Sequence, residues 1–382
     1  MKTHDVTIVG GGIIGCSIAF ELSQRNVRVA LLDRQEFMHE ASWAAAGMLS
    51  PAPDCLAGIP LVPLSLASLA LYPEFITAIE NASSLLTGYR TDGTLEVLCH
   101  GDAERELNAL VALHRGLGIA CEPMPLDEAL KMEPVLGRDA RAVGLLPDEA
   151  SVNPRDLAAA VLAAAESSGV TLLPGAEVVS LVQDRKRCTG VKSSTGDLFS
   201  AEQVVLAAGC WTSQLPGAAS YAPTIPIRGQ MISLRHHGRP IRRVLRSERG
   251  YIVPRGQSIP QTLVVGSTVE NTGYAKCVTS GGVERILAAA NEIAPELAHA
   301  EIIETWCGLR PGTPDQLPIL GPTDVEGLTI ATGHYRNGIL LAPVTAKLIA
   351  DWITERKTSF AWDEFSPLRF TCAQPDRSAA SS

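Results

Sequence analysis

The first strong hydrophobic pattern lies at the N-terminal end of the chain. Val6–Val9 is a short apolar run, glycines follow at 10–12, and Ile14–Arg25 repeats apolar residues at helical spacing. A second apolar run, Val27–Leu32, ends at Asp33. A short apolar run that leads through glycine into a 3.6-residue repeat is typical of strand, turn and helix. Residues 5–33 therefore predict a βαβ unit.

The rest of the chain mixes helical and extended patterns. Helices are expected at 66–80, 103–116, 156–167, 282–292 and 338–356. Strands are expected at 90–100, 204–208, 301–306 and 328–332, and a hairpin at 176–183 and 188–193. The segments 225–234, 241–253 and 262–269 carry β-branched runs broken by Gly and Pro, which predicts a group of antiparallel strands. Together these patterns favour the α/β class.

The longest apolar stretch, 59–76, does not predict a membrane span. It contains Pro60, Pro63 and Pro73 together with Glu74, so we expect a loop followed by a core helix. Asp5 interrupts the apolar residues at the N-terminus, which argues against a signal peptide. We therefore expect no integral membrane segment.

Composition narrows the classes of function. The chain has 382 residues, of which 46% are hydrophobic, and its 32 basic and 41 acidic residues give a net charge of −9. This acidic balance argues against nucleic acid as a partner. Nine cysteines occur without a C-x-x-C pair or zinc-like spacing, so we expect no metal and reduced thiols in the cytoplasm. The polar tail, 371–382, is expected to be frayed.

A glycine motif supplies the first candidate site. Gly10, Gly12 and Gly15 form G-x-G-x-x-G between the first strand and its helix, and Asp33 follows 18 residues after Gly15. Glycine allows the turn at 10, a close approach to a pyrophosphate at 12 and tight helix–strand packing at 15. The helix start offers free N–H groups to the pyrophosphate, and Asp33 can accept ribose hydroxyls. The context predicts dinucleotide binding; the alternative is a purely structural glycine turn.

Three further segments indicate which dinucleotide binds. Small residues at 44–47, within 39–51, would let the backbone lie against a large flat ring, although a plain small-residue loop is the alternative. The apolar strand 204–208 ends in a glycine turn at Gly209. Residues 331–343 read as strand, Gly-rich turn and helix, which again places N–H groups at a helix start. Such groups suit a flavin that gains negative charge on reduction.

Together these segments resemble the amine-oxidising flavoproteins, which include D-amino-acid oxidase, sarcosine oxidase and glycine oxidase. The similarity is strongest to glycine oxidases of the thiamin pathway. The motifs that carry this similarity are Gly10–Gly15, Ala44–Met48, Tyr251–Arg255, Cys307–Asp315 and Gly333–Pro343. The resemblance covers residues 5–360. The last two motifs are specific to this group, whereas the glycine motif is shared far more widely.

The resemblance implies a Rossmann-like FAD-binding domain with an interleaved antiparallel-sheet substrate domain. It places the FAD domain at 1–85, 146–220 and 307–370 and the substrate domain at 86–145 and 221–306. It implies FAD bound non-covalently. The residues expected around FAD are Gly10, Gly12, Ile13, Ile14, Gly15, Asp33, Arg34, Ala41, Ser42, Ala45, Ala46, Gly47, Met48, Val178, Ala208, Gly209, Trp211, Gly333, His334, Tyr335, Arg336, Asn337, Gly338, Ile339 and Leu340.

Three residues are candidates for the substrate site. Arg310 stands in an apolar, turn-forming stretch, where an arginine is a carboxylate clamp or a structural ion-pair partner, and the family match favours the clamp. The resemblance also implies substrate contacts for Tyr251, otherwise a core tyrosine, and for Arg336, otherwise an exposed loop arginine. Arg249 and Val269 fall near positions that line the pocket in relatives. Sarcosine oxidases attach flavin to a cysteine near Cys307, which is interpreted here as a small buried thiol.

The function implied is oxidation of glycine, sarcosine or small D-amino acids to the imine and 2-oxo acid. Hydride passes to FAD, O2 reoxidises it to give H2O2, and the product serves thiazole synthesis in thiamin biosynthesis. The expected partners are a small amino acid, O2 and further copies of the chain, a homotetramer by resemblance. One alternative is a related dehydrogenase that passes electrons to a quinone or partner subunit. Another is a non-catalytic flavin-binding module.

Overall fold

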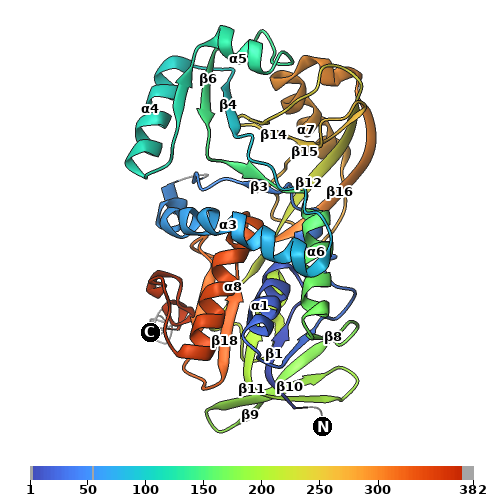
Figure 1. Ribbon diagram of the computed structural model, residues 1–382, viewed down its shortest axis with the longest axis vertical. Coiled ribbons are helices and arrows are strands. Elements are labelled where there is room, and N and C mark those ends of the chain that lie inside the picture. Colours follow the sequence, from blue (N-terminus) through green and yellow to red (C-terminus); the bar gives the residue numbers. More distant parts are fainter. Residues whose placement is uncertain (1–2, 54–55, 372–382) are drawn as a thin grey trace, which may run out of the picture.

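The computed structural model describes residues 3–53 and 56–371, arranged around two large sheets (Figure 1). The lower sheet has the strand order β17-β18-β11-β1-β2-β8, and β10 extends it from β11 to β9. Its central strands are parallel, as expected for the βαβ unit. The bounds are β1 (Thr3–Val9), β2 (Val29–Leu32), β8 (Thr171–Leu173), β9 (Val178–Asp184), β10 (Arg187–Ser193), β11 (Leu198–Leu206), β17 (Ile319–Pro322) and β18 (Leu328–Thr332).

The upper sheet is mostly antiparallel and follows the order β16-β12-β15-β14-β13-β4-β6-β5. Its strands are β4 (Thr94–Leu98), β5 (Glu122–Met124), β6 (Ala142–Leu146), β12 (Ile225–His236), β13 (Val244–Arg246), β14 (Tyr251–Arg255), β15 (Gln261–Gly266) and β16 (Glu301–Gly312). A small ladder of β3 (Met48–Leu49) and β7 (Ala150–Ser151) stands apart from both sheets. The α/β fold class is thereby confirmed. The predicted domain boundary at 306/307 falls inside β16, and the domain division itself stays a prediction.

Helices cover both sheets. The remaining elements are α1 (Ile13–Gln24), α2 (Ala41–Ala44), η1 (Leu56–Leu61), α3 (Val62–Ser83), α4 (Ala103–Gly116), α5 (Leu126–Met132), α6 (Pro154–Ser167), η2 (Gly209–Gln214), α7 (Ser280–Ile293), η3 (Pro295–His299), α8 (Gly338–Glu355), η4 (Asp363–Phe365) and η5 (Pro367–Phe370). α1, α3, α6 and α8 share one apolar core with β1 and β2, whereas α7 packs on β12, β14 and β15.

Several strands differ in the structure from the bounds predicted for them. The predicted strand 241–253 is wrong as one piece, because a turn at 247–250 divides it into β13 and β14. The predicted strands 204–208 and 301–306 are parts of the longer β11 and β16. The tail was predicted as frayed, and nearly all of it lies outside the described residues.

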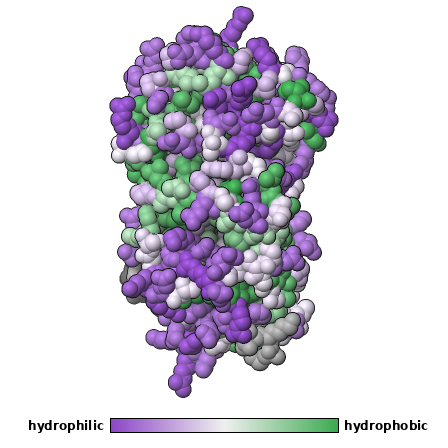
Figure 2. Space-filling view, viewed as in Figure 1, coloured by the Kyte–Doolittle hydropathy of each residue, from purple (hydrophilic) through white to green (hydrophobic). Residues whose placement is uncertain are grey.

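α3 has a core face and an apolar outer face. Leu56–Ser83 is the one helical stretch among the described residues that is long enough, and apolar enough over an 18-residue window of mean hydropathy 1.6, to cross a membrane. Figure 2 shows hydrophobic side chains gathered across the middle of the molecule, at the level of α3. The opposite face of α3 packs on α6 and α8 and buries Leu64, Tyr72 and Ile79. This packing agrees with the expected core helix.

α3 also completes the start of α8. Pro343 lies inside α8 and has no N–H to donate to the carbonyl of Ile339, four residues before it. The Tyr72 hydroxyl donates to that carbonyl at 2.6 Å. Ser68 donates to the Leu340 carbonyl at 2.6 Å and accepts from the Val344 N–H at 3.3 Å. Two α3 side chains thus hold the first turn of α8.

Candidate active site

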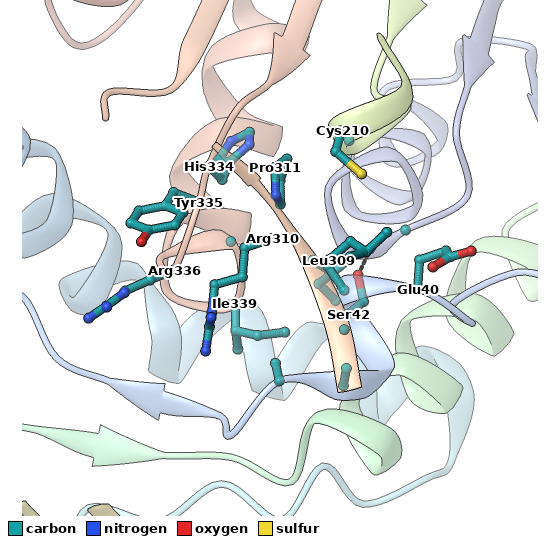
Figure 3. A pocket seen from close by; sticks show the side chains of 18 of the residues that line it. Glu40, Ser42, Cys210, Leu309, Arg310, Pro311, His334, Tyr335, Arg336 and Ile339 are labelled. Carbon is teal, nitrogen blue, oxygen red and sulfur yellow. Dashed lines mark hydrogen bonds between the residues drawn. The ribbon is translucent and has the colours of Figure 1, made fainter. Parts of the chain in front are cut away.

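A cavity of about 840 Å³ runs between the two sheets, and most predicted site residues line it. Figure 3 shows Arg310, Tyr335 and Arg336 on one side of β16 and Glu40 and Cys210 on the other. Of the predicted residues, Gly15, Gly333 and Leu340 do not line the cavity. Segments far apart in the sequence therefore converge on one cavity.

The glycine turn is fastened at the start of α1. The Asp33 carboxylate accepts from the N–H groups of Gly11 and Gln35 at 2.7 and 3.0 Å. Burial raises the pKa of Asp33, although these hydrogen bonds oppose the increase. The Ile13 N–H donates to the Ser42 hydroxyl at 2.9 Å. Ser42 therefore orders the turn in addition to lining the cavity.

Gly15 acts through packing. A Cβ at this position would lie 1.9 Å from the Gly10 carbonyl oxygen, so only glycine lets α1 approach the turn this closely. Because Gly15 is absent from the cavity wall, its contribution to cofactor binding is indirect. This agrees with the packing role that the motif gives to its third glycine.

Aromatic and charged residues form the end of the cavity beyond β2. The Arg34 guanidinium lies 4.0 Å from the ring centre of Trp211 and pairs with Glu40 at 3.1 Å. Glu40 also binds Lys276 at 2.9 Å, and the Tyr274 ring packs on Trp211. Sequence reasoning named Arg34 and Trp211 but missed Glu40. A single charged residue in a loop carries no periodic signal.

The start of α8 faces the cavity from the other side. No side chain caps this helix, and the Gly338 and Ile339 N–H groups have no acceptor within the part of the chain that the structure describes. His334 is buried beside them and its Nε2 lies 3.1 Å from the Thr345 hydroxyl. Burial lowers the pKa of His334 to about 3, so this imidazole is neutral at physiological pH. It therefore adds no charge to the site.

Arg310 is held rigidly on β16. Its Nη1 donates to the Thr268 carbonyl at 3.0 Å and its Nη2 to the Ser267 hydroxyl at 2.7 Å. A Cβ on Gly229 of the neighbouring strand would lie 2.3 Å from both of these nitrogens. The guanidinium therefore lies flat against glycine backbone. Ser267 and Gly229 line the same cavity, and sequence reasoning missed both because each acts through Arg310.

Tyr251 stands near Arg310 on the cavity wall. Its hydroxyl donates to the Met231 sulfur at 3.2 Å, and its ring covers Gly266. Met48 and Ala46 pack in the same apolar cluster as Tyr251 and Met231. The small-residue segment that was expected against a flat ring thus lies beside the candidate substrate residues.

Comparison with known proteins decides the family. The model of the family described as FAD dependent oxidoreductase matches residues 5–352. The chain belongs to this family. The glycine oxidase of Geobacillus kaustophilus is 35% identical over 96% of this chain and 97% of its own length. Its crystal structure superposes with a TM-score of 0.89, at 34% identity over 97% of this chain and 99% of that one.

Two other relatives of this FAD oxidoreductase differ in length and name. The bifunctional protein ThiO/ThiG of Trichormus variabilis is 38% identical over 96% of this chain but 55% of its own length. The chain thus spans about half the length of that relative. The hydrogen cyanide synthase subunit HcnC of Pseudomonas aeruginosa is 28% identical over 99% of this chain and 98% of its own.

The cavity of the FAD oxidoreductase fits its cofactor. N–H groups of Gly12 and Ile14 at the start of α1 have no acceptor among the described residues and suit a pyrophosphate. The free N–H groups at the start of α8 suit the ring that gains electrons. A volume of about 840 Å³ is at the large end of small-molecule sites, as a dinucleotide requires.

Other expected residues of the FAD oxidoreductase fall at the edge of the site or outside it. Arg336 lines the cavity but is exposed, and its guanidinium lies 5.4 Å from the ring centre of Tyr335. Val269 also lines the cavity, whereas Arg249 lies outside it and pairs with Glu292 at 3.3 Å. Cys307 was expected to be buried but is partly exposed, because β16 directs it away from the cavity wall.

A polar network in the FAD oxidoreductase went unpredicted. Arg246 donates to Glu96 at 2.6 Å, to Ser50 at 2.9 Å and to Glu149 at 3.3 Å. Ser50 in turn donates to Glu149. These residues come from four separate segments, and no pattern in the sequence connects them. The network fastens the chain after β3 to β4 and β13 in the interior of the upper sheet.

Proposed function

We propose that this chain oxidises glycine and other small amino acids, such as sarcosine and small D-amino acids. The overall reaction converts glycine, O2 and water into glyoxylate, ammonia and H2O2. FAD, when bound, accepts the hydride that leaves the α-carbon of the substrate. The remaining work belongs to residues of the chain, which bind the carboxylate and orient the amine.

The observation that carries this proposal is the position of Arg310. It presents a fixed guanidinium to a cavity that fits FAD, and a planar guanidinium can hold a carboxylate through two N–H groups. Tyr251 and Arg336 line the same cavity and are proposed to assist, with the Tyr251 hydroxyl turning from the Met231 sulfur to the carboxylate. His334 is neutral and deeply buried, so it is not proposed as a base. A substrate that enters with a neutral amine needs none.

Rapid anaerobic mixing tests the proposal. Flavin bleaching by glycine, sarcosine, D-alanine and D-proline is recorded for the wild type and for Arg310→Ala. The wild type should be reduced by at least one of the four, and glyoxylate should form from glycine. The variant should keep its yellow cofactor and lose reduction by a factor of 100 or more. A yellow wild type that none of these amino acids reduces would contradict the proposal.

Similarity to the hydrogen cyanide synthase subunit HcnC means that the electron acceptor must be tested separately from the substrate. A dehydrogenase of the same fold would pass electrons to a quinone or a partner subunit instead of O2. Reoxidation of the reduced enzyme by O2 and by an artificial quinone distinguishes the two. Faster reoxidation by O2, with one H2O2 per glycine, supports the oxidase.

The setting of the enzyme is also proposed. The ThiO portion of ThiO/ThiG in its relative supports a role in thiazole synthesis for thiamin. A cytoplasmic location and a homotetramer are proposed by resemblance, as is the interleaved division into FAD and substrate domains. Growth of a strain deleted for this gene with and without thiazole tests the pathway, and light scattering tests the assembly.

A further inference from the structure

The turn between α2 and β3 presents an N–H group to the cavity. Gly47 has a φ of +80°, and its carbonyl accepts from the Val152 N–H at 2.9 Å. In a regular antiparallel pair the Gly47 N–H would donate back to the Val152 carbonyl. Among the described residues it has no acceptor at all. A donor is therefore left over in a residue that lines the cavity.

Arg255 binds the carbonyl that the reciprocal bond would use. This arginine ends β14, four residues after Tyr251, and does not line the cavity. Its Nη1 donates to the Val152 carbonyl at 3.0 Å and its Nη2 donates to the Ala46 carbonyl at 2.5 Å. One guanidinium thus donates to the Val152 carbonyl, opposite Gly47, and to the peptide group that precedes Gly47.

The Ala46 contact also fixes the direction of the Gly47 N–H. In a trans peptide the C=O and the N–H point to opposite sides. Because the Ala46 oxygen points at Arg255, the N–H of the next residue points away from it. A cation bound to the oxygen also polarises the peptide, which makes that N–H a stronger donor. Burial lowers the pKa of Arg255 to about 10, so it keeps its charge at neutral pH.

The part of the cavity that this N–H reaches contains the proposed substrate residue Tyr251. Ala46 and Met48 pack with Tyr251 and Met231, beside the candidate substrate residues. The reactive ring must meet the substrate there. We propose that Arg255, acting through the Ala46–Gly47 peptide, is a positioning residue that aims a polarised N–H at the flavin ring and thereby favours the reduced cofactor. The inference requires FAD in this cavity but not a particular amino-acid substrate.

Three variants of the holoenzyme test this role. Arg255→Met removes the charge and both donors. Arg255→Lys keeps the charge but loses the planar guanidinium that donates to two carbonyl groups at once. Arg90→Met is the matched control: Arg90 is a neighbouring guanidinium that binds Asp92 and the Arg242 carbonyl and makes no contact with the turn. The readouts are the FAD dissociation constant, the midpoint potential against reference dyes and the melting temperature of the apoprotein.

Arg255→Met should weaken FAD binding at least tenfold. It should also shift the oxidised-to-reduced equilibrium at least tenfold toward the oxidised form, which is about 30 mV for a two-electron couple. Arg255→Lys should recover part of both changes, and Arg90→Met should change neither by more than twofold. If Arg255→Met fails to fold, Arg255→Lys should still shift the equilibrium at least threefold.

The proposal would be overturned if the oxidised-to-reduced equilibrium stayed within twofold of wild type in whichever Arg255 variant folds. Arg255 would then be only a structural anchor. An equal shift in Arg90→Met would also overturn it, because general charge loss would suffice. Both outcomes are independent of the amino acid oxidised, so they do not bear on the proposed function.

Discussion

At the scale of single residues, the candidate site depends on groups that act through a neighbour. Arg310 is readable from the sequence, but its geometry comes from Ser267, Thr268 and Gly229. Both Arg310 and Arg255 donate to protein oxygens, so each is fixed before a ligand arrives. Such preorganisation lowers the entropic cost of binding.

Gly229→Ala should damage substrate binding while sparing the cofactor. The added Cβ would sit 2.3 Å from the Arg310 nitrogens, so the guanidinium must move. We expect the affinity for glycine to fall at least tenfold in anaerobic flavin titrations, with FAD content unchanged. Gly281→Ala is the control, because a Cβ there meets nothing within 4 Å. Wild-type glycine affinity in Gly229→Ala would show that Arg310 does not need its present position.

His334 should make the apoprotein sensitive to acid. Its folded pKa of about 3 lies below the usual value of 6.5, so only the unfolded chain takes up this proton as the pH falls from about 6.5 to 3. Stability is therefore lost on acidification across that window, by up to about 1.4 kcal/mol per pH unit. Urea unfolding of apoprotein at pH 4, 5, 6 and 7 should show a shallower loss for His334→Gln. Parallel curves would contradict a neutral, buried imidazole.

At the scale of elements, α8 depends on α3 because Pro343 interrupts its hydrogen bonds. Pro343 removes one backbone donor, and the Tyr72 hydroxyl replaces it. The first turn of α8, which faces the cavity, is therefore held by side chains from a helix some 270 residues earlier in the chain.

Tyr72→Phe should destabilise the protein by about 1–3 kcal/mol, the usual cost of a buried carbonyl left without a donor. Chemical denaturation measures this change. FAD binding should weaken as well, since the helix start loses its anchor. Tyr89→Phe serves as the control: its ring stacks on Tyr72, and its hydroxyl makes none of these contacts with α8. Equal effects of the two substitutions would argue against the Tyr72 hydrogen bond as the cause.

At the scale of the whole molecule, the cavity joins the two sheets. Its wall includes the starts of α1 and α8 around the lower sheet and parts of β12, β14 and β16 in the upper one. A ligand that fills it makes contact with both sheets at once. Its binding free energy should therefore appear as stability of the entire chain.

FAD should accordingly raise stability and protect both sheets together. At a free concentration one hundred times its dissociation constant, FAD should add about 2.7 kcal/mol. Hydrogen exchange should slow at the start of α1 and also along β14 and β16. Protection confined to the lower sheet would show that the upper sheet does not join the binding site.

Local patterns predicted the fold well where each element carries its own signal. The βαβ unit and α4 follow directly from apolar spacing. The strand, turn and helix at 331–343 are recognisable because glycine directly follows an apolar strand. Periodicity missed β5, β6, β8 and β17, which are short and gain their pairing only from the sheet. It also ran β13 and β14 together, because the turn at 247–250 contains a single glycine.

The site was predictable for residues that touch a ligand directly and hidden for the rest. Glycines at helix starts and an arginine in an apolar stretch stand out in a sequence. Arg246 and Glu149 do not, because an ion pair between distant segments leaves no local trace. Arg255 lies within a recognisable motif, yet its contact with Ala46 depends on two segments about 200 residues apart.

The contact between Gly229 and Arg310 has an evolutionary consequence. Every amino acid except glycine carries a Cβ, so no single substitution at position 229 preserves the space that the guanidinium occupies. Position 310 can therefore change alone, whereas position 229 can lose its glycine only if the Arg310 guanidinium gives up its present place. In a library of random variants selected for amino-acid oxidation, position 229 should accept new residues only where position 310 has changed too, and such double variants should have acquired a different substrate.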